Sequence, residues 1–489
     1  MGRIITWVSV MMVFPLLVSL GYREWNIAVD FVLSISVGLS LGLALQLMPK
    51  PKGQLSWLEG MTIASLSWIF MVLVSALPFW LSGFYLSYLD AIFDAMSGYT
   101  TTGLTLVTDL DHLPYGVNMW RQLICFLGGQ GVVVLVLTFF LKNAPGSFKL
   151  YVGEAKSDKI LPNVVHTARA IWYIGLMFLA IGTVSLGAVA FLEGMRPDRA
   201  LLHGLWIFLA GWSGAGYTPQ SQSILYYHST VFELLSLAFM LLGSVNFALH
   251  YAVLTKKRRE LWQNIETKAY VISIMTLLML LYLGLNRLGV YSTTFALFRK
   301  GFFQLISAHT GTGYATVYSA DFAFRWGALP VFTLILAMLF GGMTGSTAGG
   351  LKMLRVGIVG KGVIQDVKRL FYPESAVVVT KFHFYSDMVL NDQHVRSALM
   401  IIILYILTFA VGTGVGAMYG YPLTDAAFES ASAVGNVGLS AGITSAAMPV
   451  GMKITYILIM YLARLEFLSV FALIAIIIAG VTRKARRVF

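Results

Sequence analysis

Four segments of this chain share a glycine-centred pattern, and this repetition constrains the fold more than any other feature. The segments are GYTTTGLT around Gly103, GWSGAGYT around Gly216, AHTGTGYA around Gly313 and AVGNVGLS around Gly438. Each lies between two apolar stretches, so one unit of span, glycine loop and span occurs four times. Four such units around a polar glycine loop predict a membrane pore.

The composition indicates that the bilayer is the solvent. The chain has 58% hydrophobic and 11% charged residues and a mean hydropathy of +0.78, whereas soluble domains carry roughly 25% charged residues. A helix needs roughly 20 apolar residues to cross about 30 Å of hydrocarbon. About ten stretches are long enough, at residues 4–21, 27–48, 61–83, 119–141, 170–192, 231–254, 269–290, 328–357, 396–417 and 452–480.

The basic residues cluster in alternate loops of this map. Cytoplasmic loops of membrane proteins carry an excess of Lys and Arg, so the side that holds the clusters is predicted to be cytoplasmic, with both termini there. The formal net charge of +12 then follows mostly from topology, and no basic domain suggests nucleic-acid binding. The clusters comprise Lys50, Lys52, Lys142, Lys149, Lys156, Lys159, Lys256, Lys257, Arg258, Arg259, residues 352–369, Arg483, Lys484, Arg486 and Arg487.

Four short segments between the paired spans are predicted to be half-crossing pore helices, each ending at a glycine pattern. They lie at 90–98, 200–211, 298–308 and 424–433. Non-helical backbone persists in a membrane only where it is buried in protein or lines a water-filled cavity. We therefore expect an all-α integral membrane protein with four parallel M1–pore helix–M2 repeats in pseudo-fourfold arrangement around one pore. The predicted units are an N-terminal two-helix hairpin at 1–52 and repeats at 53–165, 166–265, 266–393 and 394–489.

The glycine loops have the chemistry of a filter for a dehydrated cation. Rings of backbone carbonyls can replace an ion's hydration shell, and glycine adopts the required backbone turns without steric cost. No ring of carboxylates accompanies the glycines, which argues against selectivity for divalent ions. The predicted ion-binding residues are Thr100, Thr101, Thr102, Gly103, Ser213, Gly214, Ala215, Gly216, Thr310, Gly311, Thr312, Gly313, Gly435, Asn436, Val437 and Gly438.

A second site is predicted below the filter. The ten residues GGMTGSTAGG contain five glycines, which together cost about 5 kcal/mol of helix propensity relative to alanine. The stretch should break its helix near mid-membrane and form a flexible constriction. Its body would be Gly345, Ser346, Thr347, Ala348, Gly349 and Gly350.

Arg464 is the predicted companion of this loop. A guanidinium inside an apolar span costs at least about 2.5 kcal/mol unless it faces a cavity or a partner. Facing the pore, it would repel cations when the passage is narrow. Glu466 does not share its helix face, so carbonyls of the glycine loop are candidate partners. The alternative is a buried structural bridge to a neighbouring helix.

Other polar residues within the apolar segments have weaker interpretations. His309 either faces the pore, which would make conduction depend on pH, or packs behind the filter. Asp90 and Asp94 lie four residues apart on one pore helix, so an outer cation-attracting rim is one interpretation. Bracing of pore helices or of repeat packing is the expected role of Asp94, Glu429, Glu233 and Asn246.

The four filter-like segments, the N-terminal hairpin, GGMTGSTAGGLK at 341–352 and ARLE at 463–466 resemble the Trk/Ktr/HKT superfamily of cation transporters over essentially the whole chain. The resemblance implies a homodimer in the bacterial inner membrane, potassium as the transported ion, and a cytoplasmic-side gate at the glycine-rich loop. It also implies a partner, a soluble TrkA-like ring of nucleotide-binding domains. Four central glycines go with potassium in this superfamily, whereas serine in the first repeat goes with sodium. Ala463 departs from the usual GRLE motif, and we expect function to be unchanged.

The predicted function is potassium uptake through a filter that is gated by an intramembrane loop and an arginine. A sodium-permeable or proton-coupled transporter of the same fold stays open, as does the choice between channel and carrier. An intramembrane enzyme is disfavoured because the chain has no HExxH motif and no facing aspartate pair. No nucleotide-binding motif is present, and no cofactor is expected in this chain. The segment AVVVTKFHF at 376–384 could form one arm of a small cytosolic hairpin.

Overall fold

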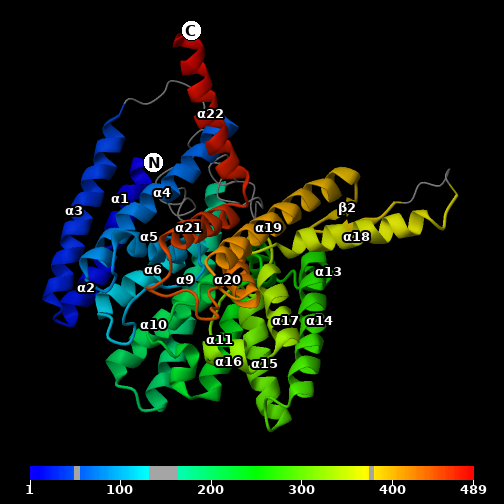
Figure 1. Ribbon diagram of the computed structural model, residues 1–489, viewed down its shortest axis with the longest axis horizontal. Coiled ribbons are helices and arrows are strands. Elements are labelled where there is room, and N and C mark those ends of the chain that lie inside the picture. Colours follow the sequence, from blue (N-terminus) through cyan, green and yellow to red (C-terminus); the bar gives the residue numbers. More distant parts are fainter. Residues whose placement is uncertain (49–55, 132–163, 374–378, 489) are drawn as a thin grey trace.

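The computed structural model describes residues 1–48, 56–131, 164–373 and 379–488. The predicted span residues 132–141, residues 376–378 of the predicted hairpin and the basic residues Lys50, Lys52, Lys142, Lys149, Lys156 and Lys159 lie outside these ranges. The described part is mostly helical, and its helices pack side by side into one body (Figure 1). The all-α prediction is therefore confirmed.

The helices are described here in the order of the predicted hairpin and four units. Among the described residues, six helices are long and apolar enough to cross a membrane, or up to eight spans if each of two bent helix pairs counts as one. The hairpin and first unit contain α1 (Gly2–Met11), α2 (Val13–Gly21), α3 (Trp25–Leu47), α4 (Trp57–Leu81), α5 (Tyr88–Tyr99) and α6 (Tyr115–Gln130). The second contains α9 (Val164–Leu192), α10 (Pro197–Ser213), the 3-10 helix η1 (Ser223–Tyr227), α11 (Thr230–Gly243), α12 (Phe247–Leu254) and α13 (Glu260–Gln263).

The third and fourth units repeat this order, with a small hairpin between them. The third contains α14 (Ile265–Leu288), α15 (Thr294–His309), α16 (Ser319–Phe324), α17 (Ala328–Leu339) and α18 (Met353–Arg369), followed by β1 (Lys381–His383) and β2 (Asp387–Val389). The fourth contains α19 (Asp392–Met418), α20 (Leu423–Gly435), α21 (Val450–Arg464) and α22 (Leu468–Val488).

The N-terminal hairpin packs closely on itself and on the first unit. A methyl group built on Gly42 of α3 would lie 2.5 Å from Oγ1 of Thr6 on α1, so glycine permits this close approach. The carboxylate of Glu24 accepts hydrogen bonds from the backbone N–H groups of Tyr115 (2.7 Å) and Gly116 (3.0 Å). These N–H groups open α6 and would otherwise lack a partner, so Glu24 ties the hairpin to the first pore unit.

Three of the predicted spans are interrupted. The stretch 231–254 bends by 100° between α11 and α12, and 452–480 bends by 112° between α21 and α22. The stretch 328–357 is split into α17 and α18 by the glycine-rich loop. Only this last break was predicted. At the C-terminal bend, Glu466 and Phe467 have φ of 50° and 66°, a conformation that a period-based prediction cannot anticipate for non-glycine residues.

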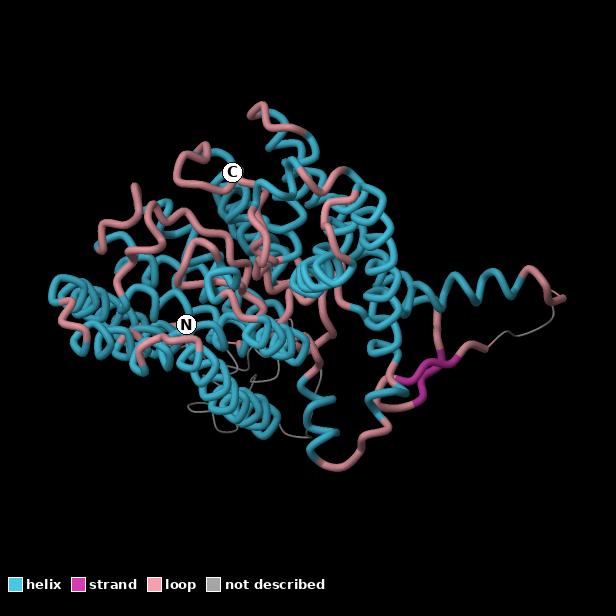
Figure 2. Tube along the Cα trace, turned by 90° about the horizontal axis from the view of Figure 1, so that it is seen from below, coloured by secondary structure: helices cyan, strands magenta, loops and turns pink. Residues whose placement is uncertain are grey.

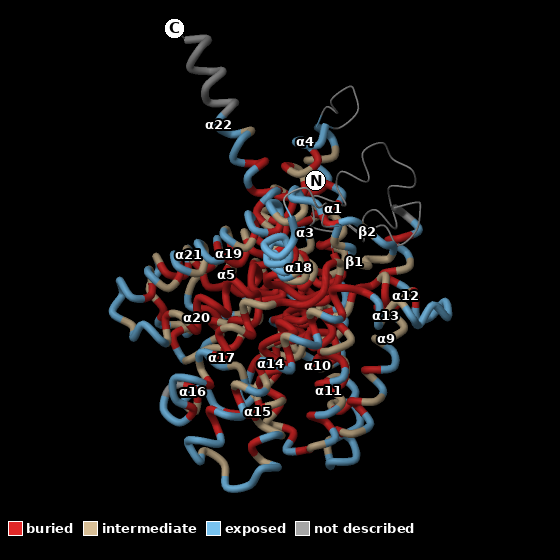
Figure 3. The backbone as a smooth tube through the Cα atoms, turned by 90° about the vertical axis from the view of Figure 1, so that its right-hand side faces the viewer, coloured by how far each residue is buried: buried red, intermediate tan, exposed pale blue. Residues whose placement is uncertain are grey.

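Buried residues concentrate in the centre of the helical body, where the four units meet (Figure 3). The α18 helix extends away from this body, and the antiparallel strands β1 and β2 lie beside it (Figure 2). The expected hairpin is thus present, with Phe382 opposite Met388. The functional candidates therefore lie at the central meeting point, and the hairpin lies to one side.

Candidate functional site

The four predicted pore helices are present as α5, α10, α15 and α20. Their N-termini begin where the sequence supplies helix starts. Ser87 accepts a hydrogen bond from Asp90 N, Thr293 accepts one from Ala296 N, and Pro197 occupies the first turn of α10. The C-terminal end of each helix leads directly into a glycine segment, here called a filter segment: residues 100–103, 213–216, 310–313 and 435–438.

Each filter segment contains two residues with positive φ, two positions apart. Glycine adopts this conformation freely and asparagine tolerates it, but a β-branched residue does so only when its surroundings hold it. Thr101 is such a residue, and its hydroxyl accepts a hydrogen bond from Arg464 (3.0 Å). The pairs, with φ between 53° and 95°, are Thr101 and Gly103, Gly214 and Gly216, Gly311 and Gly313, and Asn436 and Gly438.

The four filter segments close into a ring. The last residue of each segment is its central glycine. A methyl group built on that glycine would collide with a carbonyl oxygen of the next repeat, that of the residue before its central glycine. The distances would be 1.9 Å for Gly103 and Ala215, Gly216 and Thr312, and Gly313 and Val437, and 2.3 Å for Gly438 and Thr102. The contacts run from repeat one to two, three, four and back to one, so the segments surround a common axis.

Several of the polar side chains predicted to line the pore bond to one another. Hydroxyl oxygens lie 2.8 Å apart in Thr100 and Thr102 and 2.9 Å apart in Thr310 and Thr312. Asn436 Nδ2 donates to Thr102 Oγ1 across the contact between the fourth and first repeats (2.9 Å). These side chains therefore stabilise the shape of the ring.

The glycine-rich loop between α17 and α18 lies against one end of the ring. Its two ends are joined, since Gly341 N donates to Leu351 O (2.9 Å). A methyl group on Gly349 would lie 2.6 Å from the carbonyl oxygen of Gly435, and one on Gly311 would lie 3.4 Å from Gly349 N. The loop thus lies directly against two filter segments.

The loop is also anchored to the second repeat, at the bend between α11 and α12. The hydrogen bonds are Met343 N to Ser244 O (3.0 Å), Thr347 N to Gly243 O (3.2 Å) and Phe247 N to Gly345 O (3.3 Å). The loop and the bend lie together because each supplies hydrogen-bond partners for the backbone of the other. Within the third repeat, Thr344 N donates to Glu266 Oε1 at the start of α14 (2.7 Å).

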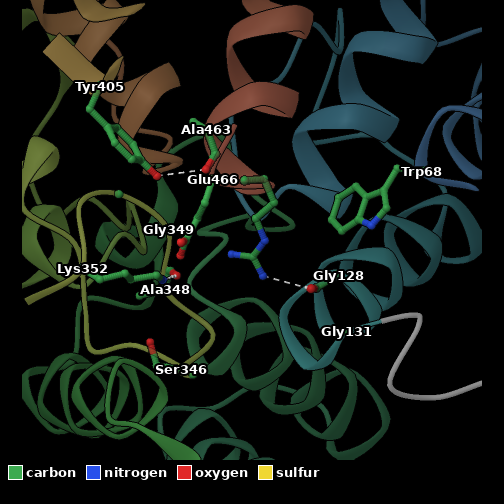
Figure 4. Close-up of a pocket in the computed structure, with 13 residues that line it drawn as sticks. Trp68, Gly128, Gly131, Ser346, Ala348, Gly349, Lys352, Tyr405, Ala463 and Glu466 are labelled. Carbon is green, nitrogen blue, oxygen red and sulfur yellow. Dashed lines mark hydrogen bonds between the residues drawn. The ribbon is translucent and has the colours of Figure 1, made fainter. Parts of the chain in front are cut away.

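Arg464 joins the loop to the first repeat. Its Nη1 donates to the carbonyl of Thr347 (2.9 Å) and to Thr101 Oγ1 (3.0 Å), and its Nη2 donates to the carbonyl of Gly128 on α6 (3.0 Å). The expected contact with the loop is present, and so is the alternative bridge to a neighbouring helix. Figure 4 shows the cavity at this place, with Ala348 and Gly349 on one side and Gly128 on the other.

Glu466 lies just past the end of α21, at the bend before α22. It forms an ion pair with Arg355 of α18. Lys352 lies at the same cavity as Arg464 and donates to the carbonyl of Ala348 in the loop. Arg464 and Lys352 thus both bond to carbonyl groups of the loop.

The other polar predictions have mixed outcomes. His309 packs behind the filter: its ring lies edge-on to Tyr270, with centroids 4.9 Å apart, and its Nε2 lies 2.7 Å from Ser273 Oγ. The outer rim of carboxylates is wrong, because Asp90 is buried against Lys453 (2.6 Å) and Asp94 is fully buried. Both carboxylates have protein partners in place of free ions.

Side chains on three pore helices brace the chain that leaves the filter. The expected bracing by Asp94 and Glu429 is confirmed. A third brace, Gln304, was not predicted from the sequence. In repeats one, three and four, the residue nine positions before the central glycine carries a side-chain oxygen. Each oxygen accepts a backbone N–H from the chain that leaves the filter. Alignment of the repeats on their glycines would have found the third. The pairs are Asp94 with Leu106 (2.8 Å), Gln304 with Thr316 (2.9 Å) and Glu429 with Ile443 (3.0 Å).

Two further expected braces also have partners. Glu233 of α11 binds Arg299 of α15 through two hydrogen bonds of 2.6 and 2.8 Å, which joins the second and third repeats. Asn246 accepts from Ala248 N (2.8 Å) and begins α12 after the bend.

On the side of the molecule where the basic loops lie, His383 of β1 joins the hairpin to α13. Its Nδ1 lies 2.8 Å from an Asp387 carboxylate oxygen and its Nε2 lies 3.0 Å from one of Glu260. The hydrogen bonds to these two carboxylates raise the pKa of His383 above its ordinary value. Protonation therefore strengthens the contact between the hairpin and the second repeat.

This architecture defines a class: a multi-pass membrane protein with a four-part ring of backbone around one axis, the arrangement of a cation-conducting protein and not of an enzyme. The comparisons identify the family. Residues 24–480 match the TrkH family model, described as a cation transport protein, and the chain belongs to this family.

Individual relatives agree over nearly the whole chain. The chain is 31% identical to the Trk system potassium uptake protein TrkH of Halomonas elongata, covering 97% of this chain and 96% of that protein. It is 30% identical to TrkG of Escherichia coli, covering 96% of each. The crystal structure of the potassium transporter TrkH from Vibrio parahaemolyticus matches with a TM-score of 0.81 and 26% identity over 96% of each chain.

Proposed function

We propose that this protein takes up potassium ions through the ring formed by the four filter segments. The observation that carries the proposal is the closed cycle of contacts between central glycines and carbonyl groups of the next repeat. A dehydrated cation requires such a ring of oxygens. The pore helices also direct the partly negative ends of their dipoles at it. The relatives named as potassium uptake proteins support potassium as the ion.

The loop at Gly345–Gly350 and Arg464 would form the gate of this pathway. The loop lies against the inner end of the filter, and Arg464 holds it to the first repeat through the carbonyl of Thr347. The described conformation would be closed, since the loop occupies the exit. Opening would require the loop to leave Arg464.

The proposed setting is a homodimer in the bacterial inner membrane, with both termini in the cytoplasm and a TrkA-like ring on the cytoplasmic face. The basic residues of the α12–α13 connection, including Arg258 and Arg259, support this orientation through the positive-inside tendency. Nucleotide regulation would reach the pore through that ring, because this chain has no nucleotide-binding motif of its own.

The test of the filter is cation flux through the purified full-length protein in liposomes. Potassium, rubidium, sodium or lithium is supplied as the only permeant cation, with an imposed membrane potential. We expect uptake of potassium and rubidium but not of sodium. Equal sodium uptake would overturn the assignment of potassium as the selected ion.

A matched pair of glycine variants assigns the flux to the ring. Gly103→Ala places a methyl group 1.9 Å from a carbonyl oxygen of the second repeat, whereas Gly83, with a similar φ of 77°, has no atom within 4 Å of the added group. Gly103→Ala should abolish selective uptake, and Gly83→Ala should keep it. Selective uptake by Gly103→Ala would contradict the proposed path.

A further inference from the structure

Each filter segment contacts the pore helix of the preceding repeat, and these four contacts are here called the seams of the ring. The seams are of two kinds. At two seams a tyrosine follows the central glycine. The hydroxyl of Tyr217 donates to the carbonyl of Asp94 (2.9 Å), and that of Tyr314 donates to the carbonyl of Ile207 (2.6 Å). Both acceptors occupy the same place in the preceding pore helix, nine residues before its central glycine.

A glycine of the preceding pore helix faces each tyrosine ring. Gly98 and Gly211 lie five residues before their central glycines. A methyl group on Gly211 would lie 3.1 Å from the ring of Tyr314, a tight contact, whereas one on Gly98 would lie at an ordinary 3.5 Å from the ring of Tyr217 and would instead collide with Ile124 at 2.4 Å. A tyrosine and a glycine are therefore paired across each of these seams.

The other two seams, on either side of the fourth repeat, have neither member of the pair. Leucine follows the central glycine in the first and fourth repeats, as Leu104 and Leu439, and alanine occupies the matching helix position, as Ala308 and Ala433. Leucine has no hydrogen-bond donor. The seams between repeats one and two and between two and three therefore have a tyrosine hydrogen bond that the other two lack.

We propose that Tyr217 and Tyr314 are positioning residues for ion selection, which fix the spacing of the filter carbonyls at their two seams. The proposal rests on the proposed function of the ring as a potassium filter. Both tyrosines are almost completely buried, so their hydroxyls hold the backbone beside the central glycine without exchange with water. Arg121 reinforces one seam, since its guanidinium lies 4.2 Å from the centre of the Tyr217 ring.

The expected effect of these tyrosines on selectivity follows from how a filter distinguishes one cation from another. Selection among dehydrated cations depends on the positions and field strength of the coordinating oxygens. A tyrosine that ties the filter backbone to a rigid helix resists contraction of the ring around a smaller ion. Loss of the hydroxyl should therefore reduce selectivity, even where the total flux is kept.

The test uses Tyr217→Phe and Tyr314→Phe in the full-length protein, with Tyr461→Phe as the control. Tyr461 is also buried and also donates to a backbone carbonyl of another repeat, that of Ser65 (2.8 Å), but it lies outside the filter. Liposome uptake of tracer rubidium is measured with potassium or sodium as competitor. We expect the potassium preference to fall about fivefold in each filter variant, which corresponds to about 1 kcal/mol for one hydrogen bond, and to be unchanged in the control.

A second measurement tests the tyrosine hydrogen bonds without any transport. Amide hydrogen exchange at residues 214–218 and 311–315 should be faster in the corresponding variant than in the wild type. An unchanged cation preference in both filter variants overturns the proposal, and so does an equal change in the control. A wild type without potassium preference would overturn the proposed function instead, and the exchange rates would then decide whether the hydroxyls hold the ring.

Discussion

Replacement of Arg464 by alanine tests the gate most directly. Among the hydrogen bonds of the guanidinium to Thr101, Gly128 and Thr347, the one to the carbonyl of Thr347 reaches the loop. Those to Thr101 and Gly128 connect to the first repeat, so their loss affects the closed and open states alike. A hydrogen bond from a charged donor contributes about 1.5–3 kcal/mol. The variant should therefore shift the equilibrium toward the open loop by about 10- to 150-fold.

The assay is rubidium leak from liposomes that contain the purified protein alone. Arg464→Ala should raise the leak by this factor until the loop is open in most molecules, with the preference for potassium over sodium kept. Arg464→Lys should have an intermediate leak, because an ammonium group does not present the guanidinium's planar array of donors. Arg325→Ala is the control for loss of an arginine, since Arg325 is exposed and pairs only with Asp321 in the described structure.

A companion variant separates the two attachments of the loop. Thr347→Val removes a hydroxyl that lies 2.7 Å from the carbonyl oxygens of both Trp212 and Gly243. One neutral hydrogen bond contributes about 0.5–1.5 kcal/mol, so the leak should rise less than in Arg464→Ala. A folded Arg464→Ala protein whose leak equals that of the wild type would show that the closed loop does not depend on the arginine.

Two further predictions concern charged groups outside the filter. Lys453→Met leaves the buried carboxylate of Asp90 without its partner, so we expect a loss of about 3–5 kcal/mol in stability, measured by thermal unfolding in detergent. Adding Asp90→Asn to this variant should recover most of the loss. Equal melting temperatures of Lys453→Met and the wild type would contradict this expectation. For His383, whose pKa is raised by Glu260 and Asp387, the stabilisation of the hairpin should be complete below about pH 6.5, the ordinary value, and lost as the pH rises through the raised pKa. Because the His383 side chain is partly exposed and Asp387 is exposed, the effect should be about 0.2–1 kcal/mol. It should be seen as a difference in amide protection of residues 381–389 between wild type and His383→Gln that disappears at high pH. A difference independent of pH would exclude a role of the charge.

Local sequence patterns were sufficient to locate some of the helices and one of their breaks. The pore helices could be located because each is a short segment between paired spans and ends at a glycine pattern. The break at residues 341–350 was predictable, since five glycines disfavour a helix whatever surrounds them. The break after Arg464 was not, because Ala463, Leu465 and Glu466 are ordinary helix formers. The break after Gly243 was not predicted either, since one glycine followed by Ser244 and Asn246 is a weak signal inside an apolar stretch. Both bends are stabilised by contacts with other repeats.

Side-chain roles depended on distant partners in the same way. Asp90 looked like part of an outer rim because Lys453, which neutralises it, lies 363 residues away in the sequence. The sequence could not show whether His309 faces the pore, because its neighbours Tyr270 and Ser273 lie on a different helix, α14. The tyrosine seams could not be predicted either, although the tyrosines and the glycines that face them are present in the sequence.

Composition, the length of the apolar stretches and the conformational freedom of glycine were enough to predict the membrane environment, the fourfold repetition, the pore helices, the glycine filter segments and the need of Arg464 for a partner. All of these are properties of short segments of the chain. The way in which the repeats join could be seen only in the folded chain: the cyclic contacts of the glycines, the anchoring of the loop and the two kinds of seam. These features depend on hydrogen bonds and close packing between residues that come together only when all four repeats are assembled.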